Sequence, residues 1–246
     1  MNLAIIGLGS MGTKIKEIAE NRGHIVNVTI DPLNPKATHQ KIKDADLSKV
    51  DVVIDFSNRD AVIDNALICA SFKKNLIIGT TGWYEKTEEI KKIAEENNIG
   101  ILWSANFSIG VNLYYKIIEN ASKLINEYDE YDIWGTELHH NNKADSPSGT
   151  TKDIAKILLE NIDRKDEIIY DRLDRKIKPN EINISSTRGG AINFSHTIAF
   201  DSLSDTITLI HNARDRGGYA LGAVKATEWL NGKTGFFNMK DFLNNK

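Results

Sequence analysis

The chain has 246 residues, 41% hydrophobic and 26% charged, a composition that predicts a soluble globular protein of one large or two modest domains. Its formal net charge of −3 gives no support for binding to nucleic acid or to an anionic membrane. The single cysteine, Cys69, excludes an internal disulfide, and no apolar run approaches the ~20 residues that span a bilayer. No signal-type segment opens the sequence, so we expect a cytoplasmic protein.

The first hundred residues alternate between short apolar runs and amphipathic stretches. Strands are expected at Leu3–Ile6, Ile25–Ile30, Val52–Ile54, Leu76–Ile78 and Ile99–Trp103. Helices are expected over Met11–Asn21, Asp60–Phe72 and Glu85–Asn97. This alternation predicts a Rossmann-type α/β domain, in which a doubly wound parallel sheet carries helices on both faces.

The pattern changes after Phe107, where we expect a domain boundary. Helices are expected over Val111–Asn126, Thr150–Asn161 and Tyr219–Leu230. Strands are expected over Tyr131–Leu138, Glu181–Thr187, Ser195–Phe200 and Asp205–His211. Because the last three strands follow one another without helices, the second domain is predicted to be α+β with a mixed or antiparallel sheet.

A glycine-rich turn joins the first strand to the first helix. It contains Gly7, Gly9, Ser10, Met11 and Gly12 and fits the pattern G-x-G-x-x-G. In dinucleotide-binding folds the three glycines permit the tight turn, the approach of the pyrophosphate and close helix–strand packing. The free N–H groups of the helix then face the pyrophosphate. A turn that serves packing alone is the competing interpretation.

Asp31 ends the second strand, 24 residues after Gly7. A carboxylate at this place can accept hydrogen bonds from the adenosine ribose and repels the 2′-phosphate of NADP. Lys14 and Lys36 could still reach that phosphate. We therefore expect both cofactors to bind, with NADH preferred over NADPH. In the competing interpretation, Asp31 is only a turn residue beside Pro32 at the end of the strand.

The loop between Glu137 and Thr150 is dense in chemically active side chains. It holds His139, His140 and Lys143, and it ends in Ser148, Gly149 and Thr150 at a predicted helix N-terminus. Such a terminus attracts anions, and the histidines and the lysine can donate protons. These groups suit a substrate with carboxylates. Neither metal-ligand spacing nor a second cysteine is present, so we expect no metal site.

This loop resembles the signature E-x-H-H-x-x-K-x-D-A-P-S-G-T of the dihydrodipicolinate reductase family. It matches at every defined position except Ser146, where the family has alanine. Similar segments run nearly from end to end, including 53–57, 78–82, 106–112, 187–190, 196–197 and 211–223. The loop is a highly specific signature, whereas the glycine turn alone is not.

The resemblance implies an oxidoreductase that reduces 4-hydroxy-tetrahydrodipicolinate to tetrahydrodipicolinate with NAD(P)H, in diaminopimelate and lysine biosynthesis. It implies that His139 and Lys143 are the proton-donating and orienting pair, and that the small dicarboxylate is bound by His140, Ser148, Gly149 and Thr150. It places the cofactor against Phe56, Ser57, Gly79, Thr80, Thr81, Ala105, Asn106 and Phe107, besides the glycine turn and Asp31.

The same resemblance implies a domain organisation and an assembly. Residues 1–107 and 217–246 would form the dinucleotide-binding domain, because the last helix returns to it. Residues 108–216 would bind the substrate and build a homotetramer.

Three departures from the family pattern are visible. Ser10 replaces an arginine of the glycine turn, the stretch between Asp31 and Val52 is short, and Phe194-Ser195 stands where the family has Gly-Glu. The roles of Arg188, Arg214 and Arg216 stay open. Another two-domain Rossmann dehydrogenase, or a dinucleotide-binding sensor without catalysis, remains as an alternative, although neither accounts for His139 together with Lys143.

Overall fold

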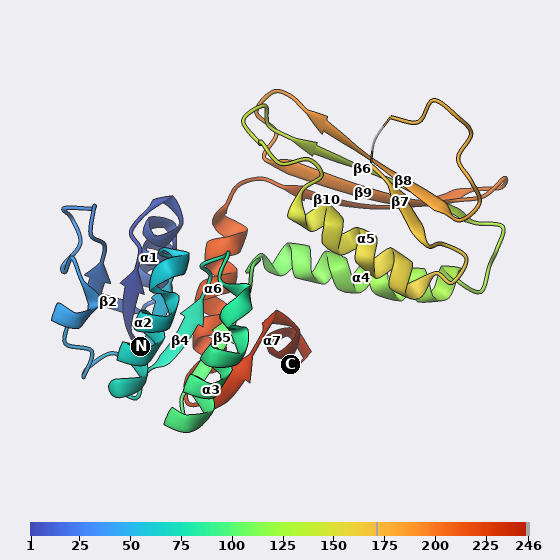
Figure 1. Ribbon diagram of the computed structural model, residues 1–246. Coiled ribbons are helices and arrows are strands. Elements are labelled where there is room, and N and C mark those ends of the chain that lie inside the picture. The colour runs from blue at the N-terminus through green and yellow to red at the C-terminus, as the bar shows by residue number, and fades with distance from the viewer. Residues whose placement is uncertain (171, 245–246) are drawn as a thin grey trace. The chain divides into compact units, whose positions relative to one another are not determined.

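The computed structural model describes residues 1–170 and 172–244, and the chain divides into two compact units. Unit 1 comprises residues 1–109 and 216–246, and unit 2 comprises residues 110–215. The chain therefore leaves unit 1 once and returns to it before its last two helices (Figure 1).

Unit 1 is built on a six-stranded sheet in the order β11-β5-β4-β3-β1-β2. Its strands are β1 (Asn2–Ile6), β2 (Ile25–Ile30), β3 (Val52–Asp55), β4 (Asn75–Ile78), β5 (Gly100–Trp103) and β11 (Gly235–Phe237). Its helices are α1 (Ser10–Asn21), α2 (Val62–Ser71), α3 (Thr87–Asn97), α6 (Gly217–Leu230) and α7 (Met239–Asn244). All strand pairs are parallel, which confirms the doubly wound Rossmann-type sheet.

Two hydrophobic cores cover the two faces of this sheet. Ala4 and Ile6 pack into the core that contains α2 and α3, whereas Leu3 and Ile5 pack into the core that contains α1, α6 and α7. Neighbouring residues of a strand point to opposite faces, so a strand buried on both faces reads as a continuous apolar run. That is why the sequence identified these strands without an alternating pattern.

The glycine turn is packed too closely for larger residues. A Cβ atom on Gly12 would lie 1.8 Å from the carbonyl oxygen of Gly7. Gly7 has a φ of 88°, and a Cβ there would lie 2.3 Å from the carbonyl oxygen of Phe56. These contacts bring α1 against β1 and bring the ends of β1 and β3 together.

Unit 2 is built on a five-stranded mixed sheet in the order β10-β9-β6-β8-β7. Its strands are β6 (Asp132–His139), β7 (Glu167–Ile169), β8 (Glu181–Arg188), β9 (Phe194–Asp201) and β10 (Thr206–Ala213). β6 pairs in parallel with β8 and antiparallel with β9, which confirms the expected mixed sheet. The helices α4 (Ile109–Ile125) and α5 (Gly149–Asn161) share one core with this sheet, and Figure 1 shows them on the same side of it.

The opposite face of the unit 2 sheet is open. Ile133 and Ile198 point into the core beneath the helices, so Trp134 and Ile210 lie on the other face. Trp134 is 43% exposed and Ile210 is 58% exposed. Among the described residues of unit 2, helices therefore cover only one face of this sheet.

The sequence missed β7, β11 and α7. Each of the two strands has three residues, too few for a periodic pattern, and β11 begins at Gly235 with a φ of 117°. The helix expected from Asp60 begins as a 3₁₀ turn over Arg59–Ala61 before α2 continues it. Among the described residues, no helix is both long and apolar enough to span a membrane.

Candidate functional site

The predicted cofactor residues lie in unit 1 at the edge formed by the carboxyl ends of the strands. Ligands of open α/β sheets bind at this edge, where the strand order reverses. In the order β3-β1-β2, the reversal falls at β1, which carries the glycine turn. Gly9 is exposed and precedes α1, and a Cβ atom there would meet nothing within 4 Å. Space for a bound group therefore exists beside the first N–H groups of α1.

A cavity of about 600 Å³ opens beside this turn, within the size range of small-molecule sites. Of the predicted residues, Gly7, Gly9, Asp31, Phe56 and Ser57 line it. The sequence analysis missed Lys41 and Lys43, which also line it. They lie at a one-turn 3₁₀ helix, Ile42–Asp44, which is too short for a periodic signal to indicate which side chains turn inward.

Asp31 combines a structural role with its predicted binding role. Oδ2 accepts the backbone N–H of Leu8 at 2.7 Å, and Oδ1 accepts those of Leu33 and Asn34 at 2.8 and 3.0 Å. Burial would raise the pKa of Asp31, but these three donors outweigh burial and hold the pKa below its usual value. The carboxylate is thus anionic at neutral pH, and it ties the glycine turn to the end of β2.

Six of the remaining predicted cofactor residues follow β4 and β5 at the same edge, and the other three begin α1. Gly79 faces the ring of Phe56, which a Cβ atom would meet at 2.1 Å, and Phe56 lies 5.8 Å from the ring of Phe107. The Thr80 hydroxyl is buried and accepts the N–H of Ser57 at 2.9 Å. The predicted cofactor residues that do not line the 600 Å³ cavity are Ser10, Met11, Gly12, Gly79, Thr80, Thr81, Ala105, Asn106 and Phe107.

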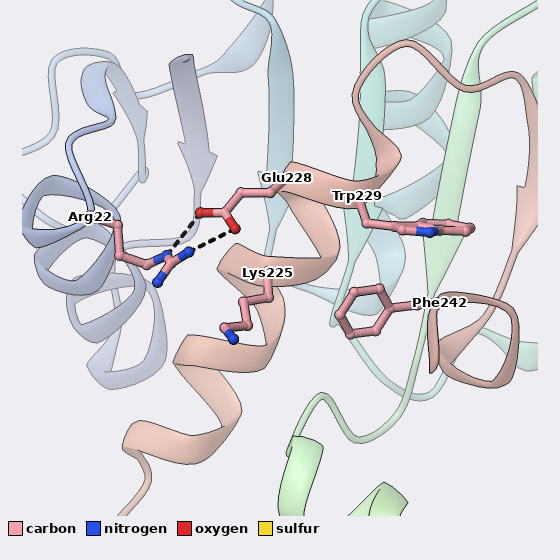
Figure 2. A pocket seen from close by; sticks show the side chains of 5 residues that line it. All are labelled: Arg22, Lys225, Glu228, Trp229 and Phe242. Atoms are coloured by element: carbon pink, nitrogen blue, oxygen red, sulfur yellow. Dashed lines mark hydrogen bonds and ion pairs between the residues drawn. The ribbon is translucent and has the colours of Figure 1, made fainter. Parts of the chain in front are cut away.

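A second cavity of unit 1, about 330 Å³, is lined by Arg22, Lys225, Glu228, Trp229 and Phe242. Figure 2 shows the Arg22 guanidinium turned toward the Glu228 carboxylate, which it contacts at 2.8 and 2.9 Å. His24 lies 2.8 Å from the same carboxylate. These contacts tie the end of α1 to α6, and none of the predicted site residues lines this cavity.

The predicted substrate residues lie in unit 2, between β6 and α5. Ser148 is the N-cap of α5, and its buried hydroxyl accepts the N–H of Thr151 at 3.2 Å. Its side chain therefore does what an ordinary N-cap does. Gly149 is exposed and Thr150 is half-buried, so the backbone of this helix start remains open to an anion.

Lys143 and His140 lie in the turn that follows β6. The Lys143 Nζ donates to Oδ1 of Asp145 at 2.5 Å, and this ion pair holds the pKa of Asp145 below its usual value. The N–H of Lys143 donates to the carbonyl of His140 at 3.2 Å. The loop is thus closed on itself by contacts between its own residues.

Behind the loop lies Glu137, whose carboxylate is completely buried. Arg188 and Ser186 each donate to its Oε1 at 2.8 Å, and Thr151 donates to its Oε2 at 2.5 Å. The N–H of Ser148 adds a donor at 3.1 Å. Burial would raise the pKa of Glu137, but donors from His196 and these residues outweigh it and hold the pKa well below its usual value.

His139 lies beside this carboxylate and is 5% exposed. Burial lowers its pKa to about 4, against the opposing effect of Glu137 and with a further lowering from His196, Arg188 and Lys143. The imidazole is therefore neutral at pH 7. Lys143, as an ammonium, is then the better proton donor of the predicted pair, and His139 is suited to accept or relay a proton.

Glu137, His139 and His196 bring three potential ligand atoms within 4.8 Å of one another, a spacing that a metal ion could use. Both oxygens of Glu137 already accept protein donors, and Arg188 supplies a full positive charge at 2.8 Å. This arrangement fits a hydrogen-bonded network better than a metal centre.

Three residues of this cluster were not assigned a role from the sequence. Arg188 also donates to the carbonyl of Asp145 at 2.7 Å and so ties β8 to the loop. His196 lies 3.2 Å from the Ser148 hydroxyl. Phe194 stacks on His139 with ring centres 6.0 Å apart. Only the pairing of β6 with β8 and β9 brings these residues together, so spacing along the chain gave no signal. Arg214 and Arg216 are both exposed.

The parallel sheet with its glycine turn, joined to a mixed-sheet unit with a polar loop before α5, is the architecture of a two-domain Rossmann-type oxidoreductase. Two family models divide the chain between them. The model described as dihydrodipicolinate reductase, N-terminus, matches residues 1–107, and the model for the C-terminus matches residues 110–243. The chain belongs to the dihydrodipicolinate reductase family, which confirms the resemblance seen in the sequence.

Relatives match over nearly their whole length. The chain is 34% identical to 4-hydroxy-tetrahydrodipicolinate reductase of Christiangramia forsetii, covering 99% of this chain and 98% of that protein. It is 37% identical to the enzyme of the same name from Staphylococcus aureus strain RF122, covering 96% and 98%. A solved structure of dipicolinate-bound dihydrodipicolinate reductase from Paenisporosarcina sp. TG-14 has the same fold, with a TM-score of 0.79, 21% identity and 97% of each chain covered.

The lowered pKa of His139 predicts a pH dependence of stability. Its folded-state pKa of about 4 lies below the unfolded value of 6.5, so its contribution to stability is complete above pH 6.5 and is lost as the pH falls toward 4. His211, whose pKa burial also lowers, acts in the same direction. The urea midpoint of the wild type should therefore fall more steeply between pH 6.5 and 4 than that of His139→Gln. Equal slopes would contradict the assigned environment of His139.

Proposed function

We propose that this chain catalyses the reduction of 4-hydroxy-tetrahydrodipicolinate to tetrahydrodipicolinate in the diaminopimelate route to lysine. The reaction consumes NAD(P)H and a proton and releases water, NAD(P)⁺ and the reduced ring. The family match over both halves of the chain supports this reaction. The observation that carries the assignment of roles is the segment from β6 to α5, which carries His139, His140 and Lys143 and leads into the open helix start at Gly149.

Unit 1 supplies a fitting place for a nicotinamide dinucleotide. When bound, this cofactor supplies the hydride. The open space at Gly9, the N–H groups that begin α1 and the adjoining 600 Å³ cavity suit a pyrophosphate with its adenosine. Asp31 would bind the ribose hydroxyls, and the residues after β3, β4 and β5 would line the nicotinamide side, as the family resemblance implies.

Unit 2 supplies the groups for the substrate. The N–H groups of Gly149 and Thr150 would bind one carboxylate, and His140 and Lys143 would contact the anionic ring substituents. Lys143 is the charged proton donor, while the neutral His139 orients or relays the proton. The Ser148 side chain acts through the cap of α5, because its hydroxyl is buried.

Replacement of Lys143 tests this division of roles. Lys143→Ala should lower kcat by roughly 100-fold or more, the scale of a lost general acid, while NADH binding stays within about 2-fold. Steady-state loss of reduced-nicotinamide absorbance with freshly generated substrate measures turnover, and fluorescence titration measures NADH binding. The matched control is Lys156→Ala, which removes an exposed lysine of α5 paired with Glu160.

The same assay separates the alternatives. Folded wild-type protein that binds NADH and gives no substrate-dependent oxidation would overturn the reductase assignment. Turnover with an amino acid or a sugar instead would favour another Rossmann dehydrogenase. Binding of NADH without any turnover would favour a sensor.

We further propose that NADH is preferred over NADPH. The anionic Asp31 carboxylate lies where the 2′-phosphate of NADPH would come, and Ser10 replaces the arginine common in the family. Lys41 and Lys43 line the same cavity and supply the charge that still admits NADPH. Lys14 already forms an ion pair with Glu17, in which its Nζ lies 2.9 Å from Oε2.

Comparison of kcat/KM for the two cofactors tests this preference. The value should be higher for NADH in the wild type, the ratio should shrink in Asp31→Asn, and Lys41→Ala should weaken NADPH more than NADH. A wild type whose kcat/KM for NADPH equals or exceeds that for NADH would overturn the proposal.

The open sheet face of unit 2 supports a homotetramer. Trp134 and Ile210 lie exposed on that face, and burial of such a surface against further copies is favourable. Analytical ultracentrifugation at micromolar concentration should give the mass of four chains, and Trp134→Asp should give a smaller species. A monomeric wild type would contradict this assembly.

We place the enzyme in the cytoplasm, where a reduced nicotinamide pool is available.

A further inference from the structure

Glu137 has no part in the reaction as proposed, yet its buried carboxylate joins β6 to α5, β8 and β9. It lies on β6 two residues before His139, so both side chains point to the same face of the sheet. Its partners come from three other places: Ser148 and Thr151 from the start of α5, Ser186 and Arg188 from β8, and His196 from β9.

A buried carboxylate is costly even when it is fully hydrogen-bonded. Its desolvation often equals or exceeds what its partners return, so an apolar side chain of similar size is frequently no worse for stability. The Glu137 carboxylate has four donors within 3.3 Å and an Arg188 counter-charge. Stability alone therefore does not explain a charged residue at position 137. The side chains around the carboxylate indicate a second reason for the charge.

The imidazole of His139 is held on several sides. Phe194 stacks on it with a ring-centre distance of 6.0 Å, and His196 meets it edge-on at 5.4 Å. Its Nδ1 is buried and has no hydrogen-bond partner among the described residues, but lies 3.7 Å from Oε2 of Glu137. Such contacts are often long in a free enzyme and shorten when substrate binds.

We propose that Glu137 is a positioning residue, whose carboxylate keeps the hydrogen of His139 on Nδ1 and leaves Nε2 as the nitrogen that meets the substrate. This inference rests on the proposed function only for its kinetic consequence. It concerns the tautomer of a histidine in the folded protein, which exists with or without turnover.

The physical argument is the choice between two neutral tautomers. An isolated imidazole in water favours hydrogen on Nε2, and an acceptor beside Nδ1 reverses that preference. The charged and titratable groups that face His139 are Glu137, His196, Arg188 and Lys143. Glu137 is the anion among them and lies on the Nδ1 side. It also stabilises an imidazolium, should His139 take up a proton during turnover.

Nitrogen-15 NMR of imidazole-labelled protein tests the tautomer directly. In the wild type at pH 7, His139 should show the Nδ1–H form. In Glu137→Gln the amide oxygen should stay with Arg188 and Ser186, which both donate at Oε1, and the NH₂ group should then face His139 and favour the Nε2–H form. A wild-type His139 in the Nε2–H form would overturn the proposal without any variant.

The matched control is Glu181→Gln. Glu181 is also completely buried and is paired with an arginine, Arg175, but it lies at the opposite end of β8. It lies seven positions before Arg188, which corresponds to roughly 23 Å along a strand. The control should leave His139 in the same tautomer as in the wild type. Its kcat should stay within about 2-fold of the wild-type value.

A double-mutant cycle gives the kinetic test. Glu137→Gln should lower kcat by roughly 10- to 100-fold with KM changed by less than about 3-fold, and it should add little to the loss caused by His139→Gln. Glu137→Asp, which keeps the charge, should recover part of kcat. Losses that multiply in the double variant would show that Glu137 acts independently of His139 and would overturn the proposal.

Failure of the positioning role and failure of the reaction remain distinguishable. If the wild type lacks reductase activity, the proposed function fails, while the NMR result still decides the tautomer. If Glu137→Gln does not fold, the wild-type tautomer and the Glu137→Asp variant decide the question.

Discussion

The buried charge of Glu137 is the constraint on which the arrangement of unit 2 depends. A carboxylate removed from water must be surrounded by donors, and here those donors come from β8, β9 and the first turn of α5. Arg188 extends the same network to the Asp145 carbonyl. The hydrogen bonds to this one anion therefore connect three strands, the start of α5 and the loop that follows β6.

In unit 1, backbone groups and close packing hold the glycine turn in place. The missing side chain of Gly12 lets α1 approach β1, and the positive φ of Gly7 turns the chain sharply enough to do so. Asp31 then fixes this turn by accepting the N–H of Leu8. The same backbone donors hold the pKa of Asp31 below its usual value, so the residue that fixes the turn is anionic at neutral pH.

The sequence predicted the elements whose pattern is local. Buried parallel strands such as Val52–Asp55 read as apolar runs, and the glycine turn is contiguous in the chain. Three-residue strands such as β7 carry no periodic signal. The cluster around His139 escaped for another reason: Arg188 and His196 are 49 and 57 residues away in sequence and become its neighbours only through strand pairing. Lys41 and Lys43 lie at a single turn of 3₁₀ helix, Ile42–Asp44, which is too short to give a periodic signal.

Phe194 shows how a departure from the family pattern is accommodated. Where the family has glycine, this ring packs between His139 and His211, with centre distances of 6.0 and 5.7 Å. An aromatic ring in that place removes water from the imidazole and so disfavours its charged form, whereas the Glu137 carboxylate favours that form. The two neighbours oppose each other in their effect on the charge of His139, but both restrict the orientation of its ring. Packing thus restricts the orientation of the ring, whereas the charge of the ring depends on the balance between these two neighbours.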